Sequence, residues 1–133
     1  MEKKPQKSRS YQDLEVWKLS IALVKEIYLI TEKFPKSESY GLTNQIRRAA
    51  VSIPSNIAEG QGRNSSKEFR QFLSIALGSV AETETQLIIA KEINFLRNDE
   101  LEPLLVTVDR IRKMLKGLSK SIRTISLSPK TEN

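Results

Sequence analysis

Apolar residues recur every three or four positions in four stretches of the chain, which is the period of amphipathic helices. The stretches cover about residues 13–33, 40–59, 65–94 and 99–125, and short polar connections separate them. No alternation typical of β-strands occurs. Because short connections favour antiparallel neighbours, the pattern predicts an all-α, antiparallel up-down four-helix bundle over residues 11–125. A basic arm over residues 1–10 and a polar tail over residues 126–133 are expected to be disordered or flexible.

The second stretch is the most informative, since two lines of residues run along it in steps of three or four. One line is apolar and consists of Leu42, Ile46, Ala49, Ile53 and Ile57. The other is polar and consists of Gln45, Arg48, Ser52, Asn56 and Glu59. An ordinary surface helix has one apolar face and scattered polar residues. The ordered polar line therefore predicts a hydrogen-bonded seam, either inside the fold or between subunits.

Glu82 of the third stretch is expected to join Arg48 and Glu59 in a buried ionic network. A network of this kind can specify helix pairing and register. We interpret the polar seam as structural rather than as a ligand site. Its predicted members are Gln45, Arg48, Asn56, Glu59 and Glu82.

Pro54 lies within the second helical pattern. Proline lacks a backbone N–H, and its ring meets the carbonyl group four residues earlier, so we expect the helix to kink or break near Pro54. The helical pattern nevertheless continues to Ala58, before Gly60 and Gly62 are expected to end it. Ser65, followed three residues later by Glu68, predicts a capped start for the third helix.

Two features of the pattern predict self-association. The first helix has two apolar lines, one of Leu14, Trp17, Ile21, Val24 and Tyr28 and the other of Val16, Leu23, Ile27 and Ile30. The apolar positions of the third helix cover more than half of its circumference, and Ser74, Gly78 and Ala81 form a line of small residues where another backbone can approach. A single bundle core would leave part of this apolar surface exposed, so we expect a homo-oligomer.

The central segment closely resembles the signature of a bacterial family of small four-helix-bundle proteins encoded in intervening sequences within 23S rRNA genes. The resemblance extends over residues 11–97. It is carried by Leu14-Glu15-Val16-Trp17, Phe34-Pro35, Tyr40-Gly41-Leu42, the Gln45–Gly60 block, Glu68-Phe69, Ala76-Leu77-Gly78-Ser79 and Glu82. The accessory proteins of diversity-generating retroelements are more distant relatives. The resemblance implies an up-down bundle that assembles into a ring, typically a pentamer, with no known catalytic activity. The retroelement relatives bind nucleic acid and a reverse transcriptase.

The net charge of +6 is concentrated at the ends of the chain. Residues 1–10 carry four Lys or Arg against one Glu, residues 110–133 carry seven against one, and residues 11–109 carry eleven against fourteen acidic residues. A basic arm and terminal helix are typical of proteins that bind a polyanion, although solvated tails and faces have the same composition. The candidate nucleic-acid-binding residues are Arg110, Lys113, Lys116, Lys120 and Arg123, helped by Lys3, Lys4, Lys7 and Arg9.

The sequence contains no histidine and no cysteine, which excludes several classes of site. Cys–His nucleophiles, Ser–His–Asp triads, the usual zinc sites and Glu-x-x-His di-iron sites all need one of these residues. Gly60-Gln61-Gly62 lacks the preceding strand of a dinucleotide-binding motif. We therefore expect no enzymatic activity, no cofactor and no metal, a carboxylate-only enzyme being the remaining catalytic alternative.

We expect an oligomeric protein that binds nucleic acid, with structured RNA as the expected target, through phosphate contacts and little base reading. The alternative is an assembly scaffold that docks a protein partner, such as a reverse-transcriptase-like enzyme. No apolar run approaches the roughly 20 residues that span a membrane, and the first ten residues lack the apolar region of a secretory signal. We therefore expect a cytoplasmic location and no membrane partner.

Overall fold

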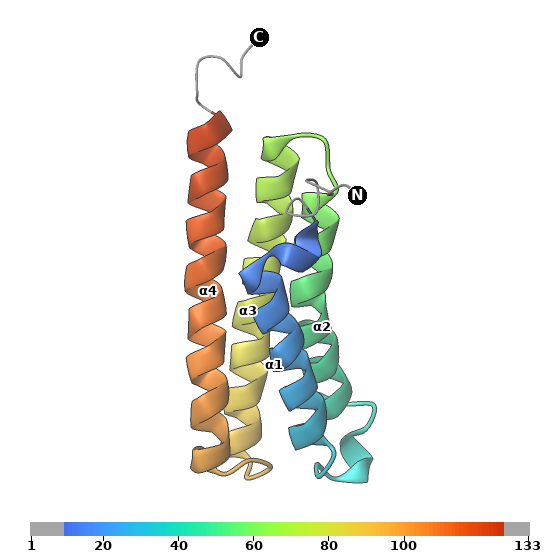
Figure 1. Ribbon diagram of the computed structural model, residues 1–133. Coiled ribbons are helices and arrows are strands. Elements are labelled where there is room, and N and C mark those ends of the chain that lie inside the picture. The colour runs from blue at the N-terminus through green and yellow to red at the C-terminus, as the bar shows by residue number, and fades with distance from the viewer. Residues whose placement is uncertain (1–9, 127–133) are drawn as a thin grey trace, which may run out of the picture.

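The computed structural model describes residues 10–126, which form four long helices and two short 3₁₀ helices (Figure 1). The elements are η2 (Tyr11–Asp13), α1 (Glu15–Thr31), η3 (Lys36–Glu38), α2 (Leu42–Gln61), α3 (Ser66–Glu92) and α4 (Asn98–Ser126). No strand occurs among these residues, so the predicted all-α four-helix class is confirmed. The predicted helix ends lie within two residues of the observed ones. Apart from Ser10 and Ser126, the expected arm and tail lie outside the described residues.

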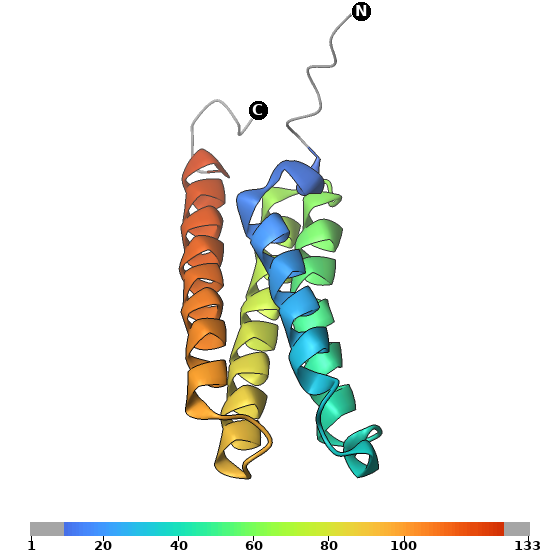
Figure 2. The same ribbon diagram turned by 60° about the horizontal axis from the view of Figure 1, so that its bottom comes forward.

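Each long helix packs against two of the other three. α1 and α3 both contact α2 and α4, whereas within residues 10–126 neither α1 and α3 nor α2 and α4 are in contact. In Figure 1 the chain descends through α1, ascends through α2, descends through α3 and ascends through α4. Figures 1 and 2 place the start of η2 and the end of α4 at the same end of the bundle as the loop between α2 and α3. We call this end of the molecule the terminal end.

The hydrophobic core runs along the inner faces of all four helices. Its fully buried side chains include Leu23 and Ile27 of α1, Ile46, Ile53 and Ile57 of α2, Leu73, Val80 and Leu87 of α3, and Val108, Ile111 and Leu115 of α4. Burying each of these side chains contributes about 1.5–3 kcal/mol relative to exposure. Only one of the two apolar lines of α1 lies in this core. In the other line Trp17, Ile21 and Val24 are half-buried, and Tyr28 is 41% exposed.

Local capping explains where α3 begins and ends. The Ser65 hydroxyl accepts a hydrogen bond of 3.1 Å from the Glu68 backbone N–H, which confirms Ser65 as the N-cap. At the other end Asn94 has a φ of 67° and donates to the Lys91 carbonyl, while the Phe95 N–H donates to the Ala90 carbonyl at 2.8 Å. These two bonds form a Schellman motif, which turns the chain from α3 toward α4.

α2 continues through Pro54 without a break, so of the two outcomes expected at this proline, a kink or a break, the break does not occur. A kink at Pro54 remains a prediction. Gly60 also differs from expectation, because it lies inside the helix and is buried, and Gly62 is the C-cap. A Cβ atom at Gly60 would lie 2.7 Å from Phe72 Cβ and 2.9 Å from Phe69 Cδ1. Gly60 therefore permits the close approach of α3 to the end of α2.

α3 is the one described helix that is long and apolar enough to cross a membrane by length and composition. These two criteria are weak evidence, because the core helices of soluble proteins meet them as well. The buried residues of α3, among them Leu73, Val80 and Leu87, belong to the same core cluster as residues of the other three helices.

Gly60→Ala is expected to lower the free energy of unfolding by about 1–3 kcal/mol, because the added methyl group overpacks the contact with Phe69 and Phe72. Gly117→Ala is the matched control, since a Cβ at Gly117 meets no atom within 4 Å. The control should be neutral or stabilising by up to about 1 kcal/mol, from helix propensity alone. Urea denaturation of both variants measures the difference. Equal effects from the two substitutions would contradict the tight packing at Gly60.

Candidate nucleic-acid interface

The charges of α4 are segregated along its length. Its acidic residues, Asp99, Glu100, Glu102 and Asp109, all precede its basic residues, Arg110, Arg112, Lys113, Lys116, Lys120 and Arg123. Such an order complements the helix dipole, but that effect falls off within the last turn of a helix. The cations begin several turns before the end of α4. Helix-dipole stabilisation therefore does not account for the basic half of α4, by which we mean residues 110–126.

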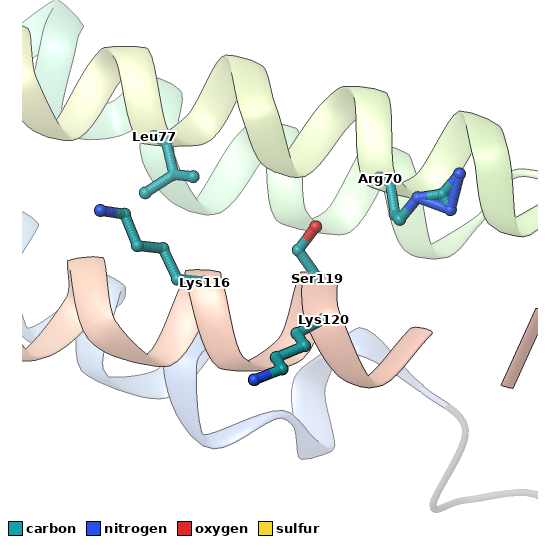
Figure 3. A pocket seen from close by; sticks show the side chains of 5 residues that line it. All are labelled: Arg70, Leu77, Lys116, Ser119 and Lys120. Carbon is teal, nitrogen blue, oxygen red and sulfur yellow. The ribbon is translucent and has the colours of Figure 1, made fainter. Parts of the chain in front are cut away.

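The structure distributes the predicted cations over two grooves. Arg110 lines a groove of about 370 Å³ between α1 and α4, which also contains Glu15 and Lys18. Lys116 and Lys120 line a second groove of about 370 Å³ between α3 and α4 (Figure 3). Arg110, Lys116 and Lys120 are all exposed. The fold therefore places Arg110 on the opposite flank of α4 from Lys116.

Lys113 is exposed but has an acidic partner. Its Nζ atom lies 3.2 Å from Oδ2 of Asp109, and Nη1 of Arg112 lies 3.0 Å from Oδ1 of the same carboxylate. The hydrogen bond from Lys113, assisted by Arg112, holds the pKa of the Asp109 carboxyl below its ordinary value. The pair therefore persists to lower pH than an unperturbed aspartate would allow, and it is lost as the pH falls through the lowered pKa. Arg112 also pairs with Glu84 of α3, which anchors α4 to α3.

The remaining predicted cations lie at or beyond the limits of the described chain. Arg123 belongs to α4, but its side chain is outside the part that the structure describes. Lys3, Lys4, Lys7 and Arg9 lie entirely outside the described residues. The described chain begins and ends at the terminal end, where the basic half of α4 also lies (Figures 1 and 2).

Arg70 of α3 was not among the predicted residues, yet it lines the α3/α4 groove together with Leu77, Lys116, Ser119 and Lys120. A signal for it exists in the sequence. Arg70, Leu77 and Glu84 are spaced by seven residues, so they share one face of α3. Because Glu84 pairs with Arg112 of α4, that face is directed toward α4.

Part of the predicted polar seam joins α2 to α3. The hydroxyl groups of Ser52 and Ser79 lie 2.7 Å apart, and Nδ2 of Asn56 donates to the Ser52 hydroxyl at 2.9 Å. Nε2 of Gln86 donates to Oε1 of Gln45 at 3.5 Å. These short polar side chains link the two helices beside their shared apolar core.

The buried ionic network is not formed within one chain, which leaves a position between subunits as the other location expected for it. Arg48, Glu59 and Glu82 are exposed, and Glu59 pairs instead with Arg63 at 2.6 Å. The reason is helical geometry. At about 100° per residue, Arg48 and Glu59 lie about 80° and 60° farther from the core than Asn56 does. A seam between subunits, the other interpretation of these residues, remains a prediction.

No group of three or more Asp and Glu side chains within residues 10–126 is arranged to hold a metal ion. The basic half of α4 contains no acidic residue, and Asp109, which precedes it, is paired with Arg112 and Lys113. The chemistry available on this surface is therefore the binding of anions by cationic and hydroxyl donors.

Comparison with known proteins relates most of the bundle to one family. Residues 12–117 match the family described as 23S rRNA-intervening sequence protein. The chain is also similar to a crystal structure from Bacteroides thetaiotaomicron VPI-5482, described as a protein with unknown function from the S23 ribosomal protein family. That similarity has a TM-score of 0.71 at 25% sequence identity and covers 79% of this chain and 98% of the other. None of the curated proteins compared with the chain matches it.

The placement of the seam residues predicts different costs for two substitutions. Arg48→Ala should change the free energy of unfolding by less than about 0.5 kcal/mol, because Arg48 is exposed. Ser52→Ala should lower it by about 1 kcal/mol, because the bonds to Ser79 and Asn56 are lost. Chemical denaturation of both variants provides the comparison. A loss of about 3 kcal/mol for Arg48→Ala would instead mean that Arg48 is buried and paired in an assembly.

Proposed function

The chain belongs to the family of 23S rRNA-intervening sequence proteins, and we propose that it is a non-enzymatic protein that binds RNA phosphates through the basic half of α4. The observation that carries the proposal is the run of exposed cations Arg110, Lys113, Lys116 and Lys120, with no acidic residue in the described part of α4 after Asp109. Such a run provides the cationic surface on which sequence-independent affinity for a polyanion depends.

The kind of nucleic acid is inferred from two sources. The family name refers to 23S rRNA, and the related structure from Bacteroides thetaiotaomicron is assigned to a ribosomal protein family. Both favour RNA over DNA as the target. Trp17 and Phe69 are half-buried and pack against the core, whereas Tyr28 and Tyr40 are 41% and 96% exposed. Neither tyrosine belongs to α4, so phosphate contacts are expected to dominate over base stacking on the basic half. A cytoplasmic site of action is part of the same proposal.

Removing the basic half should remove RNA binding. With Arg110, Lys113, Lys116, Lys120 and Arg123 all changed to Gln, affinity is expected to be lost at physiological salt. Lys116→Gln/Lys120→Gln alone should lower the slope of log affinity against log salt by about 1.5, at about 0.7–0.9 per contact. Fluorescence anisotropy with a labelled RNA measures both values.

The matched control for the double variant is Lys25→Gln/Lys36→Gln, which removes the same charge from exposed positions of α1 and η3. Its salt slope should equal that of the wild-type protein. Circular dichroism and light scattering establish that each variant has the wild-type fold and mass. Wild-type affinity in the folded five-residue variant would contradict the proposal and favour the scaffold alternative.

We also propose that the protein works as a homo-oligomer, with five subunits on the basis of the family resemblance. The support in the structure is apolar surface that one chain leaves uncovered. Ile75 and Ile89 of α3 and its C-cap residue Ile93 are 52%, 43% and 47% exposed. Gly78 lies on the same helix, and a Cβ there would meet no atom within 4 Å. Repetition of a basic patch around a ring would raise avidity for RNA without new contacts.

Light scattering at micromolar concentration is expected to give a mass several times that of one chain. Association should be stronger at high salt if apolar contacts dominate it, since salt screens the repulsion between the positively charged chains. A mass equal to one chain under both conditions would contradict the oligomer.

The second candidate function, a scaffold that docks a protein, is favoured by one groove. Trp17, Ile21 and Val24 of α1 and Val51, Pro54 and Ala58 of α2 line a groove of about 260 Å³ with almost no polar surface. An apolar helix face of a partner suits such a groove. RNA affinity that stays low even at low salt distinguishes this function from the first.

A further inference from the structure

The α3/α4 groove contains a half-buried arginine whose charge has no partner. The Nη1 atom of Arg70 has less than 1 Å² of accessible area and makes no hydrogen bond. The other described arginines are either paired with carboxylates or exposed. Arg47, Arg63, Arg97 and Arg112 are paired, and Arg48 and Arg110 are exposed. Among the arginines whose side chains the structure describes, Arg70 is therefore the partly buried one without a partner.

The surroundings of Arg70 provide donors and no acceptor of opposite charge. The groove holds about 370 Å³ and is lined by Leu77, Lys116, Ser119 and Lys120 in addition to Arg70. In Figure 3 Lys116 extends toward Leu77, and the Ser119 hydroxyl points toward α3 from between Lys116 and Arg70. The guanidinium group of Arg70 points along α3, away from Ser119 and Lys116. Lys120 extends along the side of α4 that faces away from α3 in this view. None of the described residues that line the groove carries a carboxylate.

This arrangement is costly without an anion. A desolvated donor without an acceptor loses the hydrogen bonds that it would make to water, and the penalty is larger for a charged group. Neighbouring cations add mutual repulsion. About four turns farther along α3, Glu84 pairs with Arg112 of α4, so Arg112 avoids both costs. Arg70 has no such residue, so an anion from outside the chain is the missing partner.

We propose that the groove between α3 and α4 binds one phosphate group at the guanidinium group of Arg70, with the Ser119 hydroxyl as a further donor and with Lys116 and Lys120 adding positive charge along the groove. The planar guanidinium group matches two phosphate oxygens at once, while a lysine supplies a point charge and a serine hydroxyl supplies a further donor. The volume lies within the range of small-ligand pockets.

The inference deepens the proposed function and rests on it only in part. The phosphate group belongs either to an RNA backbone or to a small phosphorylated molecule, and the chemistry of the groove is the same for both. With RNA as the source, Arg70 would extend the basic half of α4 onto α3. The site then adds a fixed anchor to a surface of otherwise flexible lysines.

Inorganic phosphate is the probe for the site itself. Titrated at constant ionic strength against chloride, saturating phosphate is expected to raise the Tm of the wild-type protein by on the order of 5 °C. Arg70→Gln should abolish this rise in Tm. Arg70→Lys should retain only part of it, because lysine keeps the charge but cannot form the bidentate hydrogen bonds of the guanidinium group. Lys25→Gln, which removes an equal charge from α1, should retain the full rise.

The stability of the variants without phosphate separates binding from packing. Arg70→Gln should be at least as stable as the wild-type protein in chloride, because an unpaired charge has been removed. An equal phosphate-dependent rise in the wild-type protein and Arg70→Gln would overturn the site. That result would not contradict RNA binding by the basic half of α4. The phosphate site and RNA binding can therefore be disproved independently.

Measuring RNA binding by Arg70→Gln identifies the source of the phosphate group. If Arg70→Gln also lowers the salt slope for RNA by about one, the ligand is a backbone phosphate. If the phosphate effect on Tm is lost while RNA affinity is unchanged, the ligand is a small phosphorylated molecule. Both results support the phosphate site.

Discussion

The packing of α2 against α3 fixes the geometry on which the other features depend. Ile46, Ile53 and Ile57 of α2 and Leu73, Val80 and Leu87 of α3 are fully buried, and the spacing of the α3 residues is seven. Together these side chains contribute on the order of 10 kcal/mol of burial free energy before entropy is subtracted. The buried row Leu73, Val80 and Leu87 sets the rotation of α3 about its own axis, because these three side chains must face the core. Once this rotation is fixed, every other position of α3 has a defined neighbour.

The rotation of α3 determines what faces α4. Residues three positions before Leu73, Val80 and Leu87 lie to one side of the buried row, and these are Arg70, Leu77 and Glu84. Glu84 pairs with Arg112, Leu77 packs against the core, and Arg70 lies in the groove beside Ser119. The same core that stabilises the bundle therefore places an unpaired cation next to the basic half of α4. Gly60 supports this arrangement by allowing Phe69 and Phe72 to approach α2 closely.

The four helices and the Ser65 cap were predictable because each depends on local spacing. The period of apolar residues defines a helix wherever it occurs, and a serine followed by a glutamate three positions later caps a helix by itself. Gly60 was misread because a glycine that ends a helix and a glycine under a neighbouring aromatic residue look alike in sequence. Whether Arg48 and Glu59 are buried depends on a rotation of a few tens of degrees about the axis of α2. A spacing of three or four residues in the sequence does not define so small a rotation. Arg70 was missed because its significance depends on the absence of a carboxylate from a neighbouring helix.

The proposed affinity for RNA depends on phosphate contacts rather than on base reading. The most direct test is the salt dependence of wild-type binding to two structured RNAs of unrelated sequence but equal length. The account predicts similar affinities and the same steep negative slope of log affinity against log salt for both, at about 0.7–0.9 per phosphate contact. Affinities that differ by orders of magnitude between the two RNAs, or a slope near zero, would contradict it.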